Sequence, residues 1–133
     1  MNSDTVSGSC LCGQVRFHVE LPSKWCAHCH CSMCRKYHGA GYVTWVGLEE
    51  QRFHLQDGQS PLSWYESSSG ARRGFCSHCG SSLFFQSKQW AGEIHVALGA
   101  FDQPIDRQPQ AHAFYNTHVD WMPIDESLKI FKG

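Results

Sequence analysis

Two short cysteine hooks, each closed by a glycine, constrain the folding of this chain more than any other feature. They occupy residues 10–13 (CLCG) and 76–80 (CSHCG). A chain that turns tightly around a metal needs positive backbone φ angles, and glycine adopts these at the lowest cost. Four thiolates form a closed tetrahedral zinc site. We therefore predict that a structural zinc joins the two hooks through Cys10, Cys12, Cys76 and Cys79.

Such a site would contribute free energy to folding, because it hardly exists in the unfolded chain. Four thiolates around Zn²⁺ carry a net charge of about −2. Backbone amides and a cation such as Arg72 or Arg73 could offset that charge. His78 lies within the second hook, and we interpret it as a hydrogen-bonding neighbour of the site or as an exposed residue rather than as a ligand.

The segment from residue 26 to residue 34 (CAHCHCSMC) holds the other four cysteines, and two arrangements fit it. In one, Cys29, Cys31 and Cys34 bind a second zinc whose fourth position stays open for water or a substrate thiolate, which is the pattern of a catalytic zinc. In the other, Cys26 closes the site and the metal is structural. The spacing leaves both arrangements open, although four ligands so close together would need a very tight loop.

Metal binding explains the eight cysteines better than disulfides do. The first five residues are polar, so no signal peptide is visible, and we expect a cytoplasmic protein whose thiols stay reduced. No segment approaches the roughly 20 apolar residues that cross a bilayer. The net charge is −1 and no basic run occurs, so the electrostatic footprint of nucleic-acid binding is absent.

Short alternating segments separated by glycine and polar turns predict a mainly β fold. The expected strands lie at residues 14–20, 42–46, 52–55, 62–65, 73–75, 82–85 and 93–98. A turn is expected at residues 56–59. The cysteine-rich segment 26–34 is expected to be a loop that leads into a short helical turn, which Gly39 and Gly41 stop. The length and the lack of a low-complexity linker indicate one domain, 1–133, of mainly antiparallel sheet.

Other side chains carry weaker signals. We expect five aromatic residues to belong to the core: Trp45, Trp64, Tyr65, Phe84 and Phe85. We interpret His28 and His30 as hydrogen-bonding or exposed residues, because the thiolates already supply enough metal ligands. Arg35 and Lys36 follow the second cysteine cluster, where they could attract an acidic substrate or form a solvated helix face.

Three segments together resemble a known family. They are residues 8–15 (GSCLCGQV), 29–36 (CHCSMCRK) and 75–83 (FCSHCGSSL), in that order. In them the chain is similar to the glutathione-dependent formaldehyde-activating enzyme family, which includes the centromere protein V type domains. The similarity extends from about Gly8 to the region of Trp121, and all seven cysteines of the family pattern are present.

The resemblance implies an Mss4-like fold of mainly antiparallel β-sheets with zinc knuckles. It implies a structural zinc on the two hooks and a second, more labile zinc on Cys29, Cys31 and Cys34, which would form the catalytic site. In the founding activity of the family, the second zinc helps the thiol of glutathione add to formaldehyde, giving S-hydroxymethylglutathione. The family is accordingly labelled as carbon–sulfur lyases.

These observations support three functions. The first is a zinc-dependent enzyme of the carbon–sulfur lyase type that acts on a thiol or thiol adduct, such as glutathione plus formaldehyde. The second is a non-catalytic Mss4-like module that binds a protein partner through an exposed apolar patch. The third is redox sensing by Cys26 or by a metal-free cluster, which requires an accessible thiol of low pKa. We favour the enzyme, with a small-molecule thiol or aldehyde adduct as its partner and without nucleic acid or membrane.

Overall fold

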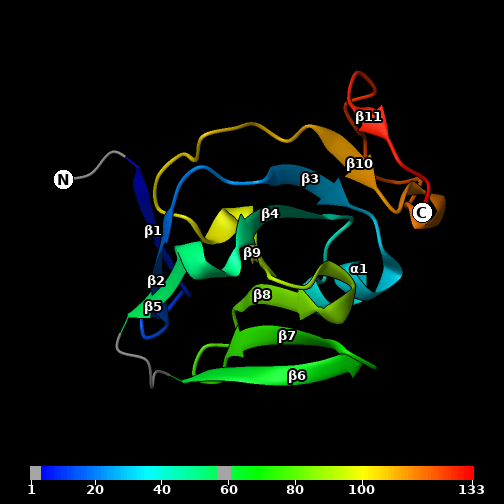
Figure 1. The fold of residues 1–133 in the computed structure, drawn as a ribbon. Helices are drawn as coiled ribbons and strands as arrows, with labels where there is room; N and C mark the ends of the chain where they lie inside the picture. The colour runs from blue at the N-terminus through cyan, green and yellow to red at the C-terminus, as the bar shows by residue number, and fades with distance from the viewer. Residues whose placement is uncertain (1–3, 57–60) are drawn as a thin grey trace.

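Eight strands form one large sheet within the residues that the computed structural model describes, 4–56 and 61–133 (Figure 1). The strand order across the sheet is β11-β10-β3-β4-β9-β8-β7-β6. The bounds of these strands are β3 Trp25–Cys29, β4 Val43–Glu49, β6 Leu62–Ser68, β7 Ala71–Cys76, β8 Ser82–Ser87, β9 Glu93–Ala97, β10 Ala111–Ala113 and β11 Lys129–Ile130. The inner strands β4 and β9 lie at the centre of this sheet.

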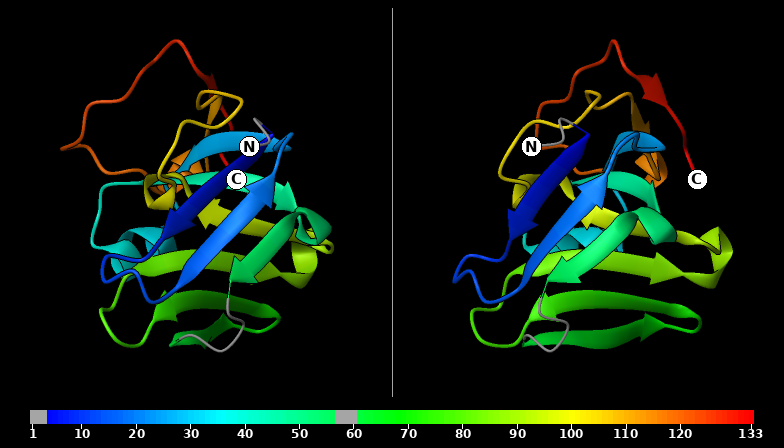
Figure 2. Two further views of the ribbon diagram at one scale, coloured as in Figure 1. Left: turned by 90° about the vertical axis from the view of Figure 1, so that its left-hand side faces the viewer. Right: turned by 60° about the vertical axis from the view of Figure 1, so that its left-hand side comes forward.

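A second sheet of three strands lies across one face of the large sheet (Figure 2). Its strands are β1 Thr5–Ser9, β2 Arg16–Glu20 and β5 Phe53–Gln56, and each is antiparallel to its neighbour. A β-bridge between Gly8 and Phe101 connects this sheet to the segment after β9. A Cβ atom on Gly8 would lie 2.4 Å from the carbonyl oxygen of Ala100, so this close approach of two backbones requires glycine.

The expected mainly β fold of antiparallel sheets is confirmed, with one exception at the edge of the large sheet. β10 pairs in parallel with both β3 and β11, whereas the other neighbouring strands are antiparallel. Through the parallel pairing, Ala113 of β10 lies opposite Cys29 of β3. The topology thus brings the carboxyl-terminal part of the chain beside the second cysteine cluster.

The helices are short. α1 spans Ser32–His38, and the 3-10 helices are η1 Glu50–Arg52, η2 Lys88–Trp90, η3 Leu98–Ala100 and η4 Tyr115–Thr117. α1 is the helical turn that the sequence predicts after the second cluster, and it ends at Gly39, whose φ of 63° is the left-handed conformation that glycine favours. Within the described part of the chain, no helix has the length and apolar character needed to span a membrane.

Different parts of the chain cover the two faces of the large sheet. On β4, Val46 and Leu48 belong to the main core beneath the small sheet, whereas Val43 and Trp45 belong to a separate buried cluster on the other face. Strand alternation explains the division, because successive side chains point to opposite faces. The main core is built from both sheets and includes Val6, Phe17, Val19, Cys26, Val46, Leu48, Phe84, Ile94 and Val96. The second face carries α1 and the second cysteine cluster.

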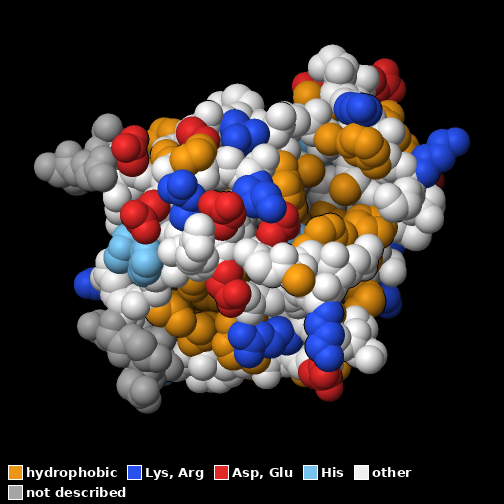
Figure 3. All heavy atoms as spheres, in the orientation of Figure 1, with side chains coloured by type: hydrophobic (Ala, Val, Ile, Leu, Met, Phe, Trp, Pro, Cys, Tyr) orange, Lys and Arg blue, Asp and Glu red, His pale blue; other side chains and the backbone are white. Residues whose placement is uncertain are grey.

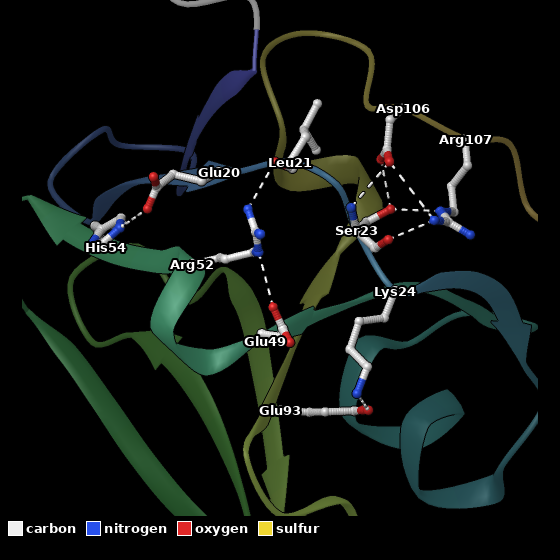
Figure 4. Close-up of polar contacts among 10 residues, drawn as sticks. All are labelled: Glu20, Leu21, Ser23, Lys24, Glu49, Arg52, His54, Glu93, Asp106 and Arg107. Carbon is white, nitrogen blue, oxygen red and sulfur yellow. Dashed lines mark hydrogen bonds and ion pairs between the residues drawn. The ribbon is translucent and has the colours of Figure 1, made fainter.

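Polar contacts fasten the connection between β2 and β3 to the long segment after η3 (Figure 4). The backbone N–H and the hydroxyl of Ser23 both donate to the carboxylate of Asp106, at 3.1 and 2.7 Å. Arg107 donates to the hydroxyl and the carbonyl oxygen of Ser23 at 2.7 and 2.6 Å. Because Ser23 is buried, these bonds satisfy polar groups that would otherwise lose their partners on folding.

Two local predictions are wrong. The segment expected to be a loop contains β3, in which Cys26 and Cys29 are buried strand residues rather than members of one loop. The strand β1 was not predicted, because its small polar residues hide the alternation. The other predicted strands are present, with ends that shift by three residues or fewer. The turn expected at residues 56–59 falls almost entirely outside the described residues.

Candidate metal centre, thiol cluster and cavity

The four cysteines of the two hooks come together at one point. The Sγ atoms of Cys10, Cys12, Cys76 and Cys79 all lie within 4.8 Å of one another. The Sγ atoms of Cys10 and Cys12 are 3.5 Å apart, and those of Cys12 and Cys76 are 3.8 Å apart. Four sulfurs bound to one zinc at about 2.3 Å in a tetrahedron would be about 3.8 Å apart. This group can therefore hold a metal ion.

The local backbone shapes this group as the sequence predicts. Gly13 and Gly80, which close the hooks, have φ angles of 81° and 86°. Both values lie in the left-handed region, where a Cβ atom is strained. The backbone N–H of Val15 donates to Cys10 Sγ at 3.2 Å. Donors of this kind stabilise the thiolate, which is the form of cysteine that binds metals.

Two side chains support the sulfurs from outside. Nδ1 of His78 lies 3.4 Å from Cys12 Sγ, in the position expected of a hydrogen-bonding neighbour. The hydroxyl of Ser81 lies 3.2 Å from Cys79 Sγ, and this hydrogen bond lowers the pKa of Cys79 to about 5. A thiol with such a pKa is ionised at neutral pH and ready to bind a cation.

The second cluster is built where β3 ends and α1 begins. Cys29 is the last residue of β3, Cys31 directly precedes α1, and Cys34 lies in the first turn of α1. The thiol of Cys29 donates to Cys34 Sγ at 3.6 Å. Among the described residues, the hook cysteines are the one group of three or more candidate ligands that is close enough together to hold a metal ion. The second cluster does not form such a group in this structure.

Hydrogen bonds give the three thiols of the second cluster different pKa values. The bonds that Cys29 makes to its two neighbours raise its own pKa. The bond from Cys29 lowers the pKa of Cys31 to about 5, with help from the backbone amides of Cys34 and Met33. It also lowers the pKa of Cys34 to about 6, with help from the positive charge of Arg73. Two of the three side chains are therefore mainly thiolates at neutral pH.

Cys26 does not join this cluster. It lies three residues before Cys29 in β3, and this odd spacing puts the two side chains on opposite faces of the strand. Cys26 pairs with Val46 and is buried in the main core at 1% exposure. Burial raises the pKa of Cys26 to about 11. The arrangement in which Cys26 closes the second site is not formed, and Cys26 lacks the accessible, low-pKa thiol of a redox sensor.

Arg73 accompanies the second cluster. We expected Arg72 or Arg73 to offset the charge of the four hook cysteines. Instead, the buried Arg73 donates from Nη1 to Cys34 Sγ at 3.4 Å, while its Nε has no hydrogen-bond partner among the residues that the structure describes. Arg72 points to the other side of β7, where its guanidinium stacks on Trp64 at 3.9 Å from the ring centre. The positive charge of a buried arginine and the negative charge of neighbouring thiolates compensate each other.

A cavity of about 790 Å³ opens beside the second cluster. Its size suits a small organic ligand, because ligand pockets commonly enclose about 300–1,000 Å³. All three cysteines of the cluster lie in its wall. The rest of the wall is mixed, and its aromatic members are Trp25, Trp45, Phe85, Trp90, His95, Phe114 and Phe131. Figure 3 shows hydrophobic side chains gathered around a hollow on the right-hand side of the molecule, below the carboxyl-terminal segment.

The aromatic residues expected in the core have three different locations. Phe84 is buried in the main core and Trp64 packs against it. Trp45 is buried in the second core cluster with Phe85 packed against it, and both also line the cavity. Tyr65 is 57% exposed. Strand alternation separates Phe84 from its neighbour Phe85, so one of them faces the core and the other faces the ligand space.

The cations of the cavity wall were not predicted. Arg35 and Lys36 are not among the lining residues, whereas Arg73 and Lys129 are.

Phe114, also in the wall, has a φ of 54°. This left-handed conformation is uncommon outside glycine and costs on the order of 1–3 kcal/mol. The chain reaches the cavity at these positions through the parallel pairing of β10 and β11, for which the sequence carries no local signal.

The two histidines between the cysteines make hydrogen bonds, as expected. Nδ1 of His28 lies 2.8 Å from the hydroxyl oxygen of Thr44. His112 donates from Nε2 to the carbonyl oxygen of Asp125 at 2.8 Å, so in the neutral ring its Nδ1 is an acceptor. Nε2 of His30 lies 2.9 Å from that Nδ1 and donates to it. These bonds tie the second cluster to the carboxyl-terminal segment.

Comparisons with known proteins find relatives along most of the chain. A profile of the family described as glutathione-dependent formaldehyde-activating enzyme matches residues 5–117. A protein of Halomonas elongata, by name a candidate glutathione-dependent formaldehyde-activating enzyme, is 31% identical over 96% of this chain and 87% of its own length. A protein of Schizosaccharomyces pombe named as an uncharacterized lyase is 27% identical over 92% of this chain and 93% of its own length.

A solved structure shares the fold. The crystal structure of a Rhodobacter sphaeroides protein matches this one with a TM-score of 0.63 and 25% sequence identity. The match covers 76% of this chain and 92% of that chain. The arrangement of sheets described above is therefore one that another natural protein adopts.

Proposed function

Because the chain belongs to the glutathione-dependent formaldehyde-activating enzyme family, we propose that it is a zinc-dependent enzyme of the carbon–sulfur lyase type. Its substrates would be a thiol such as glutathione and a small aldehyde such as formaldehyde. The product would be an adduct in which the thiol sulfur is bonded to the former carbonyl carbon. The observation that carries the proposal is the position of three cysteines, Cys29, Cys31 and Cys34, in the wall of a ligand-sized cavity.

We assign zinc to both cysteine clusters. The four hook cysteines are spaced as a tetrahedral zinc requires, and soft thiolates are ligands that zinc prefers, so this metal would be structural. Cys29, Cys31 and Cys34 offer three ligands and leave a fourth position for a substrate. A zinc ion bound there would favour the thiolate form of a thiol that occupies this position.

The residues of the chain have a simple task in this reaction. The thiol sulfur forms a bond to the carbonyl carbon, the π electrons of the carbonyl move to its oxygen, and the thiol proton ends on that oxygen. Arg73 donates a hydrogen bond from Nη1 to Cys34 and adds a positive charge to the cavity wall. This charge would stabilise the negative charge that develops on the carbonyl oxygen. The aromatic wall would exclude water and thereby strengthen these interactions. The reverse reaction breaks the carbon–sulfur bond.

The competing function is a non-catalytic zinc module that binds a protein partner. It requires two closed metal sites. Cys26, the residue that would close the second site, lies on the opposite face of β3 from Cys29. The cavity beside Cys31 likewise favours an enzyme over a closed module.

We further propose that residues 1–133 act as one domain in the cytoplasm. The small sheet and the large sheet contribute to the same hydrophobic core. All eight cysteines are free thiols, as in proteins of reducing compartments.

Zinc content and adduct formation test the proposed function. We expect the purified protein to bind one zinc at each cluster and to accelerate the exchange between formaldehyde, glutathione and S-hydroxymethylglutathione, measured by NMR. Cys31→Ser should lose the second zinc and the acceleration. Cys26→Ala is the control within the same segment, because the Cys26 side chain packs into the main core although its strand borders the cavity, and it should keep both zincs and the activity. A Cys31→Ser protein with full zinc content and full activity would contradict the proposal.

A further inference from the structure

A row of aromatic side chains leads through the cavity away from the thiol cluster. It begins at Trp45, which belongs to the same buried cluster as Cys34. The ring centre of Trp45 lies 6.1 Å from that of Phe85, and Phe85 lies 6.1 Å from Trp90. Rings at such separations are in packing contact and form a continuous apolar surface.

The far end of the cavity is also aromatic. Trp25 and Trp90 flank His95, with ring centres 4.6 and 5.5 Å from the centre of the imidazole. Trp25 is paired with Gly47 of β4, and a Cβ atom at that glycine would lie 2.2 Å from the indole. The indole therefore occupies the space that the glycine leaves. This packing holds Trp25 in the cavity wall.

His95 is the polar member of this aromatic group. Nε2 of His95 lies 2.9 Å from Oε1 of Glu93, and Oε2 of Glu93 lies 2.6 Å from Nζ of Lys24 (Figure 4 shows the Lys24–Glu93 pair). Despite its burial, the bonds from Lys24 and His95 lower the pKa of Glu93, so it is a carboxylate that accepts the Nε2–H of the imidazole.

The second ring nitrogen of His95 is left for a ligand. Burial lowers the pKa of His95, which keeps the imidazole neutral at neutral pH. A neutral imidazole that carries its proton on Nε2 has a lone pair on Nδ1 and accepts a hydrogen bond there. Among the described residues, Nδ1 of His95 has no hydrogen-bond partner, and His95 lines the cavity.

From these contacts we propose that the cavity binds the thiol adduct of an aromatic aldehyde, with the aromatic ring packed among Trp25, Phe85 and Trp90 and a hydrogen-bond donor on that ring directed to His95 Nδ1. The inference rests on the proposed function, which it narrows from a small aldehyde to an aromatic one. The bonds that form and break are the same as in the reaction with formaldehyde. Sulfur bonds to the carbonyl carbon, the carbonyl π pair moves to oxygen, and the thiol proton ends on that oxygen.

The size and polarity of the cavity favour this substrate over formaldehyde. A cavity of about 790 Å³ lies in the upper part of the range of ligand pockets, so it has room for an aromatic ring in addition to the thiol and the reacting carbon. Of the lining residues, Arg73 and Lys129 carry full charges, and Arg73 is already bonded to Cys34. A ligand that buries apolar surface against this wall therefore gains binding free energy.

Three S-substituted glutathiones test the inference: the S-methyl, the S-benzyl and the S-(4-hydroxybenzyl) derivatives. Their affinities for the zinc-loaded full-length protein are measured by titration calorimetry. The S-benzyl compound should bind about 10- to 100-fold more tightly than the S-methyl compound, because one aromatic ring is buried. The hydroxyl should add about 2- to 10-fold through its bond to His95. Equal affinities of the methyl and benzyl compounds would overturn the inference.

Variants locate the binding surface. Trp90→Ala should remove most of the preference for benzyl over methyl. Trp121→Ala is the matched control, because Trp121 is 67% exposed and is not a lining residue, and it should keep the preference. His95→Phe should keep the benzyl preference and lose the gain from the hydroxyl. If Trp90→Ala lowers the affinity for all three compounds by the same factor, the wall binds glutathione itself, and the inference is wrong.

The two proposals fail in different ways. If the protein forms the formaldehyde adduct, depends on Cys31 and shows no preference for the benzyl compound, the aromatic substrate is refuted and the proposed function stands. If the benzyl compound binds tightly through Trp90 but neither formaldehyde nor benzaldehyde forms an adduct faster than without protein, the proposed chemistry is refuted. Faster adduct formation from benzaldehyde than from formaldehyde would support both.

Discussion

At the scale of single residues, two consecutive arginines show how strand position decides a role. Arg72 and Arg73 lie next to each other in β7 and therefore point to opposite faces. Arg73 is 3% exposed and donates to Cys34 Sγ. Arg72 is exposed and donates to Oε1 of Gln86 at 2.7 Å. The pair offers a test of the buried charge in which one residue is the control for the other.

Arg73→Met should lower the rate of adduct formation by about 10- to 100-fold. The reason is the loss of a charge-assisted hydrogen bond to Cys34, which is worth about 1.5–3 kcal/mol. Arg73→Lys should recover part of the rate, because it restores the charge without the planar guanidinium. Steady-state kinetics that separate kcat from KM measure the effect.

The control for this prediction is Arg72→Met, which should change kcat by no more than about twofold, as surface substitutions usually do. Equal losses in the two variants, without rescue by lysine, would mean that position 73 contributes only to the stability of β7.

His38 should make the stability of the protein depend on pH. Burial, with help from the charge of Arg73, lowers the pKa of His38 to about 4. An unfolded histidine has a pKa of about 6.5, so the unfolded state binds more protons than the folded state between pH 6.5 and 4. Stability therefore falls as the pH is lowered through this window, by about 2 kcal/mol between pH 7.5 and 5 from this side chain.

Urea unfolding at pH 7.5 and pH 5 checks the prediction. His38→Gln removes the titrating group, so this variant should lose about 2 kcal/mol less stability than the parent protein over the same change of pH. The other titrating groups, including the thiols, are common to both proteins and cancel in the comparison. Parallel losses in the two proteins would assign the pH dependence to groups other than His38.

At the scale of elements, β3 sets the length of the cavity. Trp25 and Cys29 lie at its two ends on the same face, because they are four residues apart. At about 3.3 Å per residue, their backbones are roughly 13 Å apart. One end of the strand thus carries the aromatic far wall and the other carries a thiol of the cluster. β4 supports this arrangement through Gly47, which lies opposite Trp25.

Gly47→Ala should therefore destabilise the protein by about 1–3 kcal/mol, as expected when atoms are forced into a packed space. The new Cβ would lie 2.2 Å from the Trp25 ring, so the indole must move. Urea unfolding and tryptophan fluorescence detect these two effects. Gly99→Ala is the control, because a Cβ atom there meets nothing within 4 Å, and its stability should change by less than about 0.5 kcal/mol. Similar stabilities of the two variants would contradict the packing described here.

At the scale of the whole molecule, the hook cysteines join distant parts of the fold. Residues 10–13 lie between β1 and β2 of the small sheet, and residues 76–80 run from the last residue of β7 towards β8 in the large sheet. A metal at this point would cross-link the two sheets that enclose the main core. The same link would hold the small sheet over the face that buries Cys26 and Val46.

Removal of the metal from the hooks should unfold the protein or leave it without fixed packing. A structural zinc contributes about 10–16 kcal/mol in small zinc domains, which is comparable to the entire stability of a typical domain, about 5–15 kcal/mol. Cys12→Ser, at an exposed ligand position, should lower the melting temperature strongly and bind one zinc fewer. Thermal unfolding with and without added zinc, together with a zinc-release assay, measures this. A Cys12→Ser protein that keeps its zinc and its melting temperature would contradict the structural role.

Much of the fold could be predicted because its signals are local. The segments around Val19 and Val96 show the two-residue period of half-buried strands in their sequence, and the structure contains both strands. β3 was missed because its buried residues are cysteines. In the sequence these cysteines were interpreted as metal ligands in a loop and not as the buried positions of a strand. The parallel pairing of β10 was missed because it joins segments far apart in the chain.

The sequence by itself determined the ligand chemistry: thiol type, hook spacing and glycines with positive φ bring Cys10, Cys12, Cys76 and Cys79 within reach of one ion. Only the tertiary structure decided the surroundings of the second cluster. It turned Cys26 away, brought Arg73 to Cys34 and placed His95 in the cavity wall. The physical reason is that a hook acts over a few bonds of backbone, whereas a cavity wall depends on which faces of separate strands pack together. Alternation divides a strand into two faces, but the partner that covers each face is chosen by the packing of the whole chain.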